Sequence, residues 1–188
     1  MKIVLGSKSP RRKELLQQCG ISFIVDESTV AEVVKEYQNP QDYVMQMAIL
    51  KGEDVFSRHP KDLVICADTI VCLDELILGK PHNPLEAQAM LQTLSGRTHN
   101  VLTGVYLRLG AKKKVFVVKT EVSIDKLSEE EINQYIMMGE AYDKAGAYAI
   151  QGFFGKYVKK IRGDYYNVMG LPLNRLYREL QKFNQKTS

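Results

Sequence analysis

A group of cations follows an apolar strand near the start of the chain. The run Ile3–Leu5 predicts a strand, and residues 6–9 supply a short loop of glycine, serine and lysine. Ser9 followed by Pro10 is the pattern of a helix N-cap and a first helical residue. Cations at the positive end of a helix dipole cost about 0.3–1 kcal/mol each when exposed. Here they are Lys8, Arg11, Arg12 and Lys13. Because free N–H groups at a helix start bind anions, the segment predicts an anion site; a solvated basic face is the alternative.

Asp68 is a second candidate for chemistry. It follows the continuous apolar run Leu63–Ala67, which is typical of a strand covered on both faces. Open α/β sheets bind ligands beyond the carboxyl ends of their strands, and we expect Asp68 at such an end. A carboxylate there can serve as a general base or as a ligand of a hard cation. The alternative is a turn residue that caps the following hairpin.

Two polar side chains in later loops could contact a ligand. Lys80 precedes Pro81, which favours an extended backbone from which the ammonium can reach a phosphate or simply be exposed. Gln151 and Gly152 end a loop rich in small residues, where glycines let the backbone approach a ligand closely. A buried glutamine can read the edge of a base through its donor and acceptor groups. A purely structural turn is the alternative for this loop.

The composition is typical of a soluble globular protein. The 188 residues are 45% hydrophobic and 26% charged, which is enough for one domain with a substantial core. The net charge of +4 does not by itself indicate a nucleic-acid binder, but it suits a small polyanionic substrate. Three cysteines without a CxxC pair favour a reducing compartment. No signal peptide precedes the first expected strand and no apolar run approaches about 20 residues, so we expect a cytoplasmic protein without a membrane partner.

Helical and strand patterns alternate along the chain. The expected strands are 2–6, 21–25, 63–67, 70–73, 76–78, 100–109, 115–124 and about 156–161. Helices are expected at 10–18, from Asn39-Pro40 onward with Lys51 beside its apolar face, at 84–94, from Ser128 to about 138, and at about 173–183. Lysines 112–114 are expected in a solvated hairpin turn. This alternation favours one α/β domain over residues 1–188 with a mixed sheet.

Six blocks of the sequence together match the pattern of a known family. They are Ser7–Leu16, Ala67–Val71, Gly79–Pro81, Leu94–His99, Asp143–Tyr148 with Gln151-Gly152, and Val168–Leu173. In this order they resemble the Maf family of nucleoside triphosphate pyrophosphatases. The chain departs from the pattern at Gly6, where the family often has alanine, and at the glycine-poor turn Asp74-Glu75. The resemblance implies a mixed, twisted α/β sheet with flanking helices, similar to inosine triphosphatases, and a substrate cleft at the carboxyl ends of strands.

The resemblance also implies an activity and the residues that carry it. A nucleoside triphosphate would be cleaved between its α- and β-phosphates, to a monophosphate and pyrophosphate. Asp68 matches the catalytic carboxylate, and Asp68 and Glu32 match the positions that hold a divalent metal, Mg²⁺ or Mn²⁺. The positions that match phosphate-binding residues are Ser7, Ser9, Arg12, Lys51 and Lys80. Arg11, Thr69 and Gln151 match the positions that sort the family by base, and resemble the branch acting on dTTP, UTP and modified pyrimidine triphosphates.

Further expectations follow from the same resemblance. The family pattern implies a homodimer and a link to arrest of cell division and septum formation. One alternative is a hydrolase of damaged or methylated purine triphosphates. Another is a non-enzymatic nucleic-acid-binding regulator that uses the basic segments 8–13 and 112–114. The chain lacks a basic stripe interleaved with aromatic residues, which argues against nucleic acid as a partner.

Overall fold

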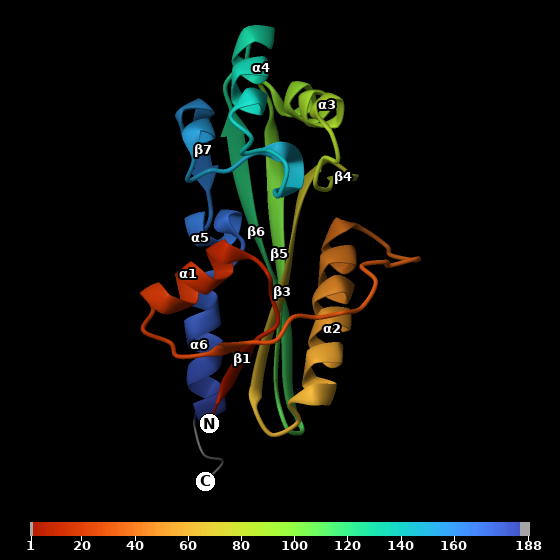
Figure 1. Cartoon of the computed structure of the whole chain (residues 1–188), viewed down its shortest axis with the longest axis vertical. Coiled ribbons are helices and arrows are strands. Elements are labelled where there is room, and N and C mark those ends of the chain that lie inside the picture. Colours follow the sequence, from red (N-terminus) through yellow and green to blue (C-terminus); the bar gives the residue numbers. More distant parts are fainter. Residues whose placement is uncertain (1, 185–188) are drawn as a thin grey trace. The chain divides into compact units, whose positions relative to one another are not determined.

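The computed structural model describes residues 2–184, which form a mixed α/β fold (Figure 1). Its strands are β1 (Ile3–Leu5), β2 (Ile24–Val25), β3 (Leu63–Leu73), β4 (Leu76–Leu78), β5 (Thr98–Leu109), β6 (Lys112–Ile124) and β7 (Val158–Arg162). Its helices are α1 (Pro10–Gln18), α2 (Pro40–Arg58), α3 (Pro84–Leu94), α4 (Glu129–Met137), α5 (Tyr165–Met169) and α6 (Leu173–Asn184). The strand order is β2-β1-β3-β5-β6-β7, with β4 paired to β3. Parallel pairs join β1 to β2 and β3, and antiparallel pairs join β3 to β4 and β6 to β7, which confirms the expected mixed sheet.

The described chain falls into two compact units. The first unit comprises Met1–Asp68, Thr103–Val118 and Gly170–Ser188, and the second comprises Thr69–Leu102 and Lys119–Met169. The boundaries between them fall inside β3, β5 and β6, so each of these strands contributes residues to both units. The expectation of one domain over residues 1–188 stays a prediction.

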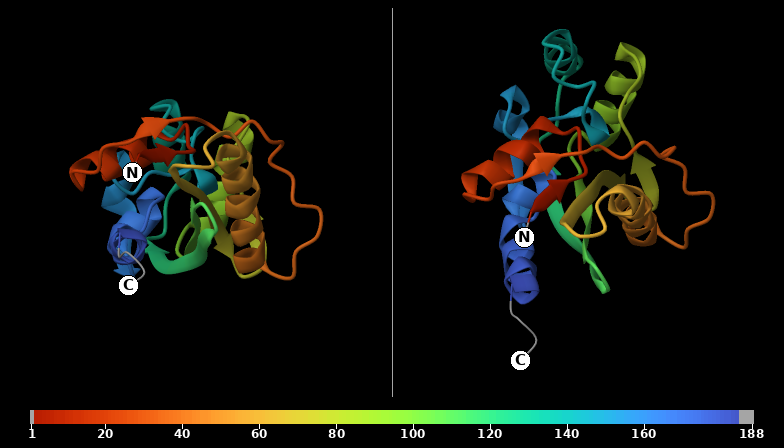
Figure 2. Two further views of the ribbon diagram at one scale, coloured as in Figure 1. Left: turned by 90° about the horizontal axis from the view of Figure 1, so that it is seen from below. Right: turned by 60° about the horizontal axis from the view of Figure 1, so that its bottom comes forward.

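In the first unit, α2 and α6 lie on opposite sides of the strands (Figure 2). The apolar stripe of α2 is buried, and it includes Val44, Met47, Ala48 and Val55. This stripe packs on Val64, Cys66 and Tyr106 of the sheet. The helix approaches β5 closely because Gly104 has no side chain: a Cβ there would lie 2.5 Å from the Val44 carbonyl oxygen. One buried apolar cluster of the first unit therefore lies between α2 and the sheet, and the same helix carries Lys51.

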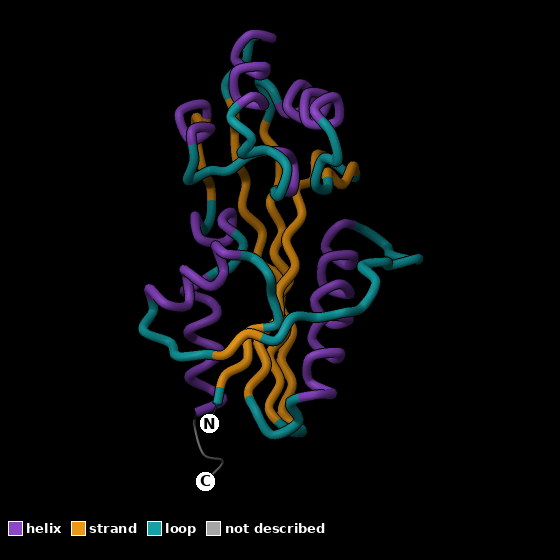
Figure 3. The backbone as a smooth tube through the Cα atoms, viewed as in Figure 1, coloured by secondary structure: helices purple, strands orange, loops and turns teal. Residues whose placement is uncertain are grey.

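The second unit has an aromatic core beside α3 and α4. The rings of Tyr135 and Phe154 lie 5.0 Å apart, and those of Tyr148 and Phe154 lie 4.9 Å apart. Such tilted aromatic pairs stabilise a core beyond the area that they bury. Two short 3₁₀ turns, Ala145–Ala147 and Phe153–Tyr157, lie among the loops of this unit, which Figure 3 draws in teal. These turns frame the loop that carries Gln151.

The structure corrects the expected ends of two strands. β3 runs without interruption from Leu63 to Leu73, although the sequence was expected to leave the sheet at Asp68. Backbone pairing sustains a strand past a polar residue, and Asp68 and Thr69 are both half-buried within it. The second strand covers only Ile24–Val25, because β1, with which it pairs, is itself only three residues long.

Two segments belong to regular elements that were not predicted there. Lysines 112–114 begin β6 instead of forming the hairpin turn, which lies at Gly110 and Ala111. Charged side chains are well tolerated at an exposed strand end. Residues Tyr165–Met169 form α5, a short helix that was not predicted from the sequence. The Asp164 carboxylate accepts the N–H of Tyr166 at 2.8 Å and thereby caps this short helix.

Candidate functional site

The first unit places polar residues where β1 ends and β3 continues. Leu5 pairs with Ile65, and the Gly6 N–H donates to the Ile65 carbonyl at 2.9 Å. The chain then leaves the sheet toward α1, whereas β3 continues for three more residues to Asp68. Asp68 therefore does not end its own strand, which corrects the sequence-based expectation. The neighbouring parallel strand β1 does end here, so the expectation of a ligand site beyond a carboxyl end applies to β1 instead of β3.

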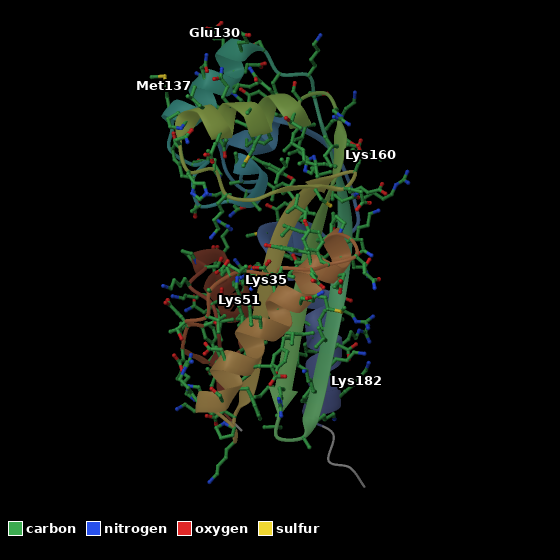
Figure 4. All side chains as sticks on the ribbon, turned by 90° about the vertical axis from the view of Figure 1, so that its right-hand side faces the viewer. Lys35, Lys51, Glu130, Met137, Lys160 and Lys182 are labelled. Carbon is green, nitrogen blue, oxygen red and sulfur yellow. The ribbon has the colours of Figure 1, made fainter. Side chains whose placement is uncertain are left out.

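Lys51 bridges the two carboxylates that were expected to act together. Its Nζ lies 2.7 Å from Oδ1 of Asp68 and 3.0 Å from Oε1 of Glu32. The side chains of Lys51 and Asp68 are only 11% and 13% exposed, whereas that of Glu32 is 63% exposed. Lys51 projects from α2, the helix on which Figure 4 labels it. A buried ion pair of this kind is costly to break from one side, so it holds Asp68 in a defined position.

Glu32 comes from the loop between β2 and α2, which is tied down at both ends. At one end Arg58 Nε donates to Asp26 at 2.9 Å. At the other end the N–H of Gln38 donates to Asp42 at 3.0 Å. Glu32 lies between these anchors and contacts Lys51, so the loop supplies the exposed carboxylate of the cluster.

Arg12 joins the loop after β1 to the start of the C-terminal segment. Its Nε donates to the Gly170 carbonyl at 2.8 Å, and its Nη1 donates to Ser7 Oγ at 3.1 Å. The Ser7 hydroxyl also accepts the N–H of Ser9 at 3.3 Å. Burial lowers the pKa of Arg12, while the charge of Asp68 is the largest effect that raises it. The guanidinium remains charged and is preorganised beside a carboxylate, as a phosphate-binding group would be.

The helix start that follows this loop has the predicted position but not the predicted cap. Ser9 is the N-cap residue and Pro10 begins α1, yet the Ser9 side chain makes no capping hydrogen bond. The first turn of α1 holds no acidic residue. Lys8 points elsewhere, to an exposed ion pair with Glu27 at 3.2 Å. Arg12 donates to Ser7, and it lies near enough to Asp68 for the charge of that carboxylate to raise its pKa.

Three of the expected site residues belong to the second unit. Thr69 follows Asp68 along β3 and is half-buried, Lys80 follows β4 and is exposed, and Gln151 lies between the two 3₁₀ turns. Gln151 is exposed, whereas a buried glutamine was expected. The Gly146 N–H donates to the Gly79 carbonyl at 3.0 Å, which joins the turn before Lys80 to the first 3₁₀ turn.

Tyr43 of α2 is a further polar neighbour of the cluster, and it was not predicted as a site residue. It precedes Lys51 by eight residues, about two helical turns, and therefore shares its face. Burial raises the pKa of Tyr43, and the charges of Asp68 and Glu32 raise it further. Its ring packs edge-on against Tyr37, with centroids 5.0 Å apart. The helical spacing from Lys51 was the signal that could have identified it.

The donor set of the cluster suits one kind of metal ion. Among residues 2–184, no group of three or more histidine, cysteine or acidic side chains is arranged to hold a metal. Asp68 and Glu32 nevertheless share Lys51 as a partner and present oxygen ligands. Mg²⁺ is commonly held by one or two carboxylates, with waters and substrate phosphates completing its shell. Two carboxylates therefore fit an ion that arrives with phosphates, and do not fit a closed all-protein metal centre.

The fold and the cluster together define an α/β protein with cations, a hydroxyl and a carboxylate at the end of a parallel strand. The chain belongs to the Maf family, since the family described as Maf-like protein matches residues 2–183. This confirms the resemblance seen in the six sequence blocks. Within the described residues, no helix is both long enough and apolar enough to cross a membrane.

Individual relatives support the same placement. A Bacillus cereus protein named dTTP/UTP pyrophosphatase is 49% identical over 183 residues, covering 97% of this chain and 96% of that protein. A Bacillus anthracis protein of the same name is 48% identical over 183 residues, with the same coverage. The structure of the Staphylococcus aureus Ham1 protein matches with a TM-score of 0.50 and 14% identity, covering 98% of this chain and all of that one. At this identity the Ham1 match supports the fold alone.

Proposed function

We propose that this protein hydrolyses dTTP and UTP between the α- and β-phosphates, releasing the nucleoside monophosphate and pyrophosphate. The observation that carries the proposal is the Lys51–Asp68 pair, with 2.7 Å between Nζ and Oδ1, at the end of β1. A phosphoanhydride substrate needs positive charge for its phosphates and a carboxylate for its attacking water. The names of the Bacillus relatives support dTTP and UTP as the substrates.

The cations of the first unit would hold the triphosphate. Phosphoryl transfer is catalysed mainly by positioning and by stabilising charge on the phosphate oxygens. Arg12 is held by Gly170 and Ser7, so its guanidinium is oriented before substrate arrives. Ser7, Ser9 and Lys51 add donors in the same unit. Lys80, in the second unit, is assigned to phosphate binding by the family pattern.

Asp68 would orient the attacking water and accept its proton. Lys51 fixes the carboxylate through Oδ1, which leaves the other carboxylate oxygen for the water. We also propose that Asp68 and Glu32 hold a divalent metal, Mg²⁺ or Mn²⁺. Such an ion, when bound, neutralises phosphate charge and lowers the pKa of a bound water. Arg11, Thr69 and Gln151 are proposed to select the base, because they match the family positions that do so.

Substitution of Asp68 by asparagine tests the catalytic assignment. We expect Asp68→Asn to lower pyrophosphate release from dTTP by about 10²–10⁴-fold, because the amide cannot accept the proton. Asp74→Asn, at an exposed turn of the same strand hairpin, is the matched control and should keep wild-type turnover. Pyrophosphate and orthophosphate are quantified separately, with Mg²⁺, with Mn²⁺ and with a chelator. Full activity of Asp68→Asn, or orthophosphate as the product, would refute the assignment.

A panel of triphosphates tests the substrate. We expect dTTP and UTP to be cleaved with a higher kcat/KM than CTP, ATP, ITP or 7-methyl-GTP. Faster cleavage of ITP or 7-methyl-GTP would favour a hydrolase of damaged or methylated purines. Tight, salt-dependent binding of an oligonucleotide without any hydrolysis would instead favour a nucleic-acid-binding regulator.

Three further proposals come from the family pattern alone. We propose that the protein is a homodimer in solution, located in the cytoplasm, and linked to septum formation. Light scattering on the purified protein measures the first, and microscopy of tagged protein during overexpression measures the other two.

A further inference from the structure

The loop that carries Gln151 is pinned on both sides by side chains of one neighbouring segment. On one side, the Tyr135 hydroxyl accepts the N–H of Ala149 at 3.1 Å. On the other, the Glu140 carboxylate accepts the N–H of Phe153 at 3.2 Å. Tyr135 belongs to α4 and Glu140 follows it closely in the chain. Gln151 lies midway between the two anchored amides, and all these residues belong to the second unit.

Both anchoring side chains are at least partly buried. Tyr135 is fully buried, and burial is the main effect that raises the pKa of its hydroxyl, to which the negative charge of Glu140 adds. Glu140 is half-buried where its carboxylate accepts the Phe153 N–H. Hydrogen bonds at such sites meet less competition from water than those of an exposed loop.

Gly152 allows the Glu140 carboxylate to lie directly against the loop backbone. A Cβ on Gly152 would be 2.2 Å from Glu140 Oε2 and 2.9 Å from its Cδ. The backbone of Glu140 is fixed in turn, since the Lys144 ammonium donates to its carbonyl at 2.7 Å. A glycine next to Gln151 is therefore needed because any side chain at position 152 would collide with the Glu140 carboxylate.

Gln151 itself is left available for a ligand. Its side chain is exposed, and its amide makes no hydrogen bond to any residue of the described chain. A free amide on a loop fixed at both flanks loses little conformational freedom on binding. This arrangement differs from an ordinary flexible loop, in which the amide and its backbone would both have to be ordered by the ligand.

We propose that Tyr135 and Glu140 are positioning residues that hold Gln151 for recognition of the nucleotide base. The inference rests on the proposed function, which assigns base selection to Gln151. Neither side chain is required to touch the substrate, because both act through the backbone of residues 149–153. Losing the anchor would make the loop sample other conformations, so the correct base would bind less tightly and discrimination between bases would fall.

The test compares variants of Glu140 with variants of Gln151 in the full-length protein. KM and kcat are measured by pyrophosphate release from dTTP and from ATP. We expect Glu140→Ala to raise KM for dTTP about tenfold, the size of one lost orienting hydrogen bond, with a much smaller change in kcat. The preference for dTTP over ATP should fall by a similar factor. Glu140→Gln should recover most of the wild-type preference, because its amide oxygen can still accept the Phe153 N–H.

A double variant separates positioning from general stability. If Glu140 acts through Gln151, the variant Glu140→Ala/Gln151→Ala should be no less selective than Gln151→Ala alone. Glu130→Ala, an exposed residue of α4 labelled in Figure 4, is the matched control and should behave as wild type. Unfolding curves verify that each variant is folded at the assay temperature. Tyr135→Phe, which removes the hydroxyl that accepts the Ala149 N–H, is a second and isosteric probe and should also lower the preference for dTTP.

Three outcomes decide the matter. The positioning role is supported if Glu140→Ala lowers the preference for dTTP in the wild-type background but causes no further loss in the Gln151→Ala background. Unchanged preference in folded Glu140→Ala, or effects that multiply with those of Gln151→Ala, overturns it while leaving the proposed function intact. A wild-type protein that does not cleave dTTP overturns the proposed function first, and this assignment with it.

Discussion

At the scale of single residues, Gly6 shows how one departure from the family pattern is compensated. A Cβ on Gly6 would lie 2.2 Å from Cys66 Sγ and 2.8 Å from Val55 Cγ2. Cys66 is buried in β3, so the sulfur fills the space that an alanine methyl would need. Since Gly6 begins the loop that leads to Ser7, this contact also sets where that loop leaves the sheet.

Replacing Gly6 by alanine should therefore destabilise the protein. We expect Gly6→Ala to lower the free energy of unfolding by about 1–3 kcal/mol through overpacking. The added Cys66→Ala substitution removes the clashing sulfur, so the double variant should show a favourable coupling of at least about 0.5 kcal/mol. Urea unfolding of the wild type, the single variants and the double variant measures this coupling. If the effects of the two substitutions on the free energy of unfolding simply add, Cys66 does not fill the space that a Cβ at position 6 would need.

His99 should make the stability of the protein sensitive to mild acid. It is buried beside Tyr148, with 2.7 Å between His99 Nε2 and the Tyr148 hydroxyl, and burial lowers its pKa to about 4. Below an unfolded pKa of about 6.5, the unfolded chain binds a proton that the folded protein does not, so stability falls as the pH falls toward 4. The loss between pH 7 and pH 5 amounts to about 2 kcal/mol for this group.

The His99→Gln variant tests this linkage. Glutamine does not titrate. Between pH 7 and pH 5 the free energy of unfolding of the variant should therefore fall by about 2 kcal/mol less than that of the wild type. Urea unfolding at the two pH values gives the comparison, with His82→Gln as an exposed control. Equal acid sensitivity of wild type and His99→Gln would mean that other groups carry the effect.

At the scale of elements, helix starts could be predicted and strand ends could not. The starts of α2, α3 and α4 are encoded by adjacent residues, and Asn39, Asn83 and Ser128 each accept the expected backbone N–H. Strand length depends on a partner that is distant in sequence, which is why β3 passes through Asp68 against its local polarity. A local pattern contains no information about such a partner.

In the candidate site, too, residues with a local sequence signal were predicted, and contacts between distant residues were not. Asp68 stood out from its own sequence neighbourhood, and Lys51 was assigned by the family pattern. The Gly170 carbonyl that orients Arg12 was not foreseen, since 158 residues separate the two. Glu140 was also missed, because its importance lies in a contact with the backbone of Phe153 rather than in a motif of its own.

Two serine N-caps offer a matched pair for testing capping against function. Ser128 accepts the Glu131 N–H in a complete capping box, whereas Ser9 makes no side-chain cap bond. We expect Ser128→Ala to cost about 1 kcal/mol of stability. Ser9→Ala should cost less than about 0.5 kcal/mol.

Activity should follow the opposite order. Ser9→Ala should reduce pyrophosphate release from dTTP, because Ser9 is proposed to bind phosphate, and Ser128→Ala should not. Thermal unfolding and the release assay on both variants measure the two effects. A large stability loss in Ser9→Ala would mean that its hydroxyl has a structural role instead.

At the scale of the whole molecule, the question is whether two compact units unfold as one. β3, β5 and β6 each contribute residues to both units, so unfolding either unit would shorten all three strands. We therefore expect one cooperative transition, as for a single domain. Amide hydrogen exchange at increasing urea reports α2 of the first unit and α3 of the second separately. The slowest amides of both helices should converge on one free energy of opening, and a lasting difference above about 1 kcal/mol would show two independently unfolding domains.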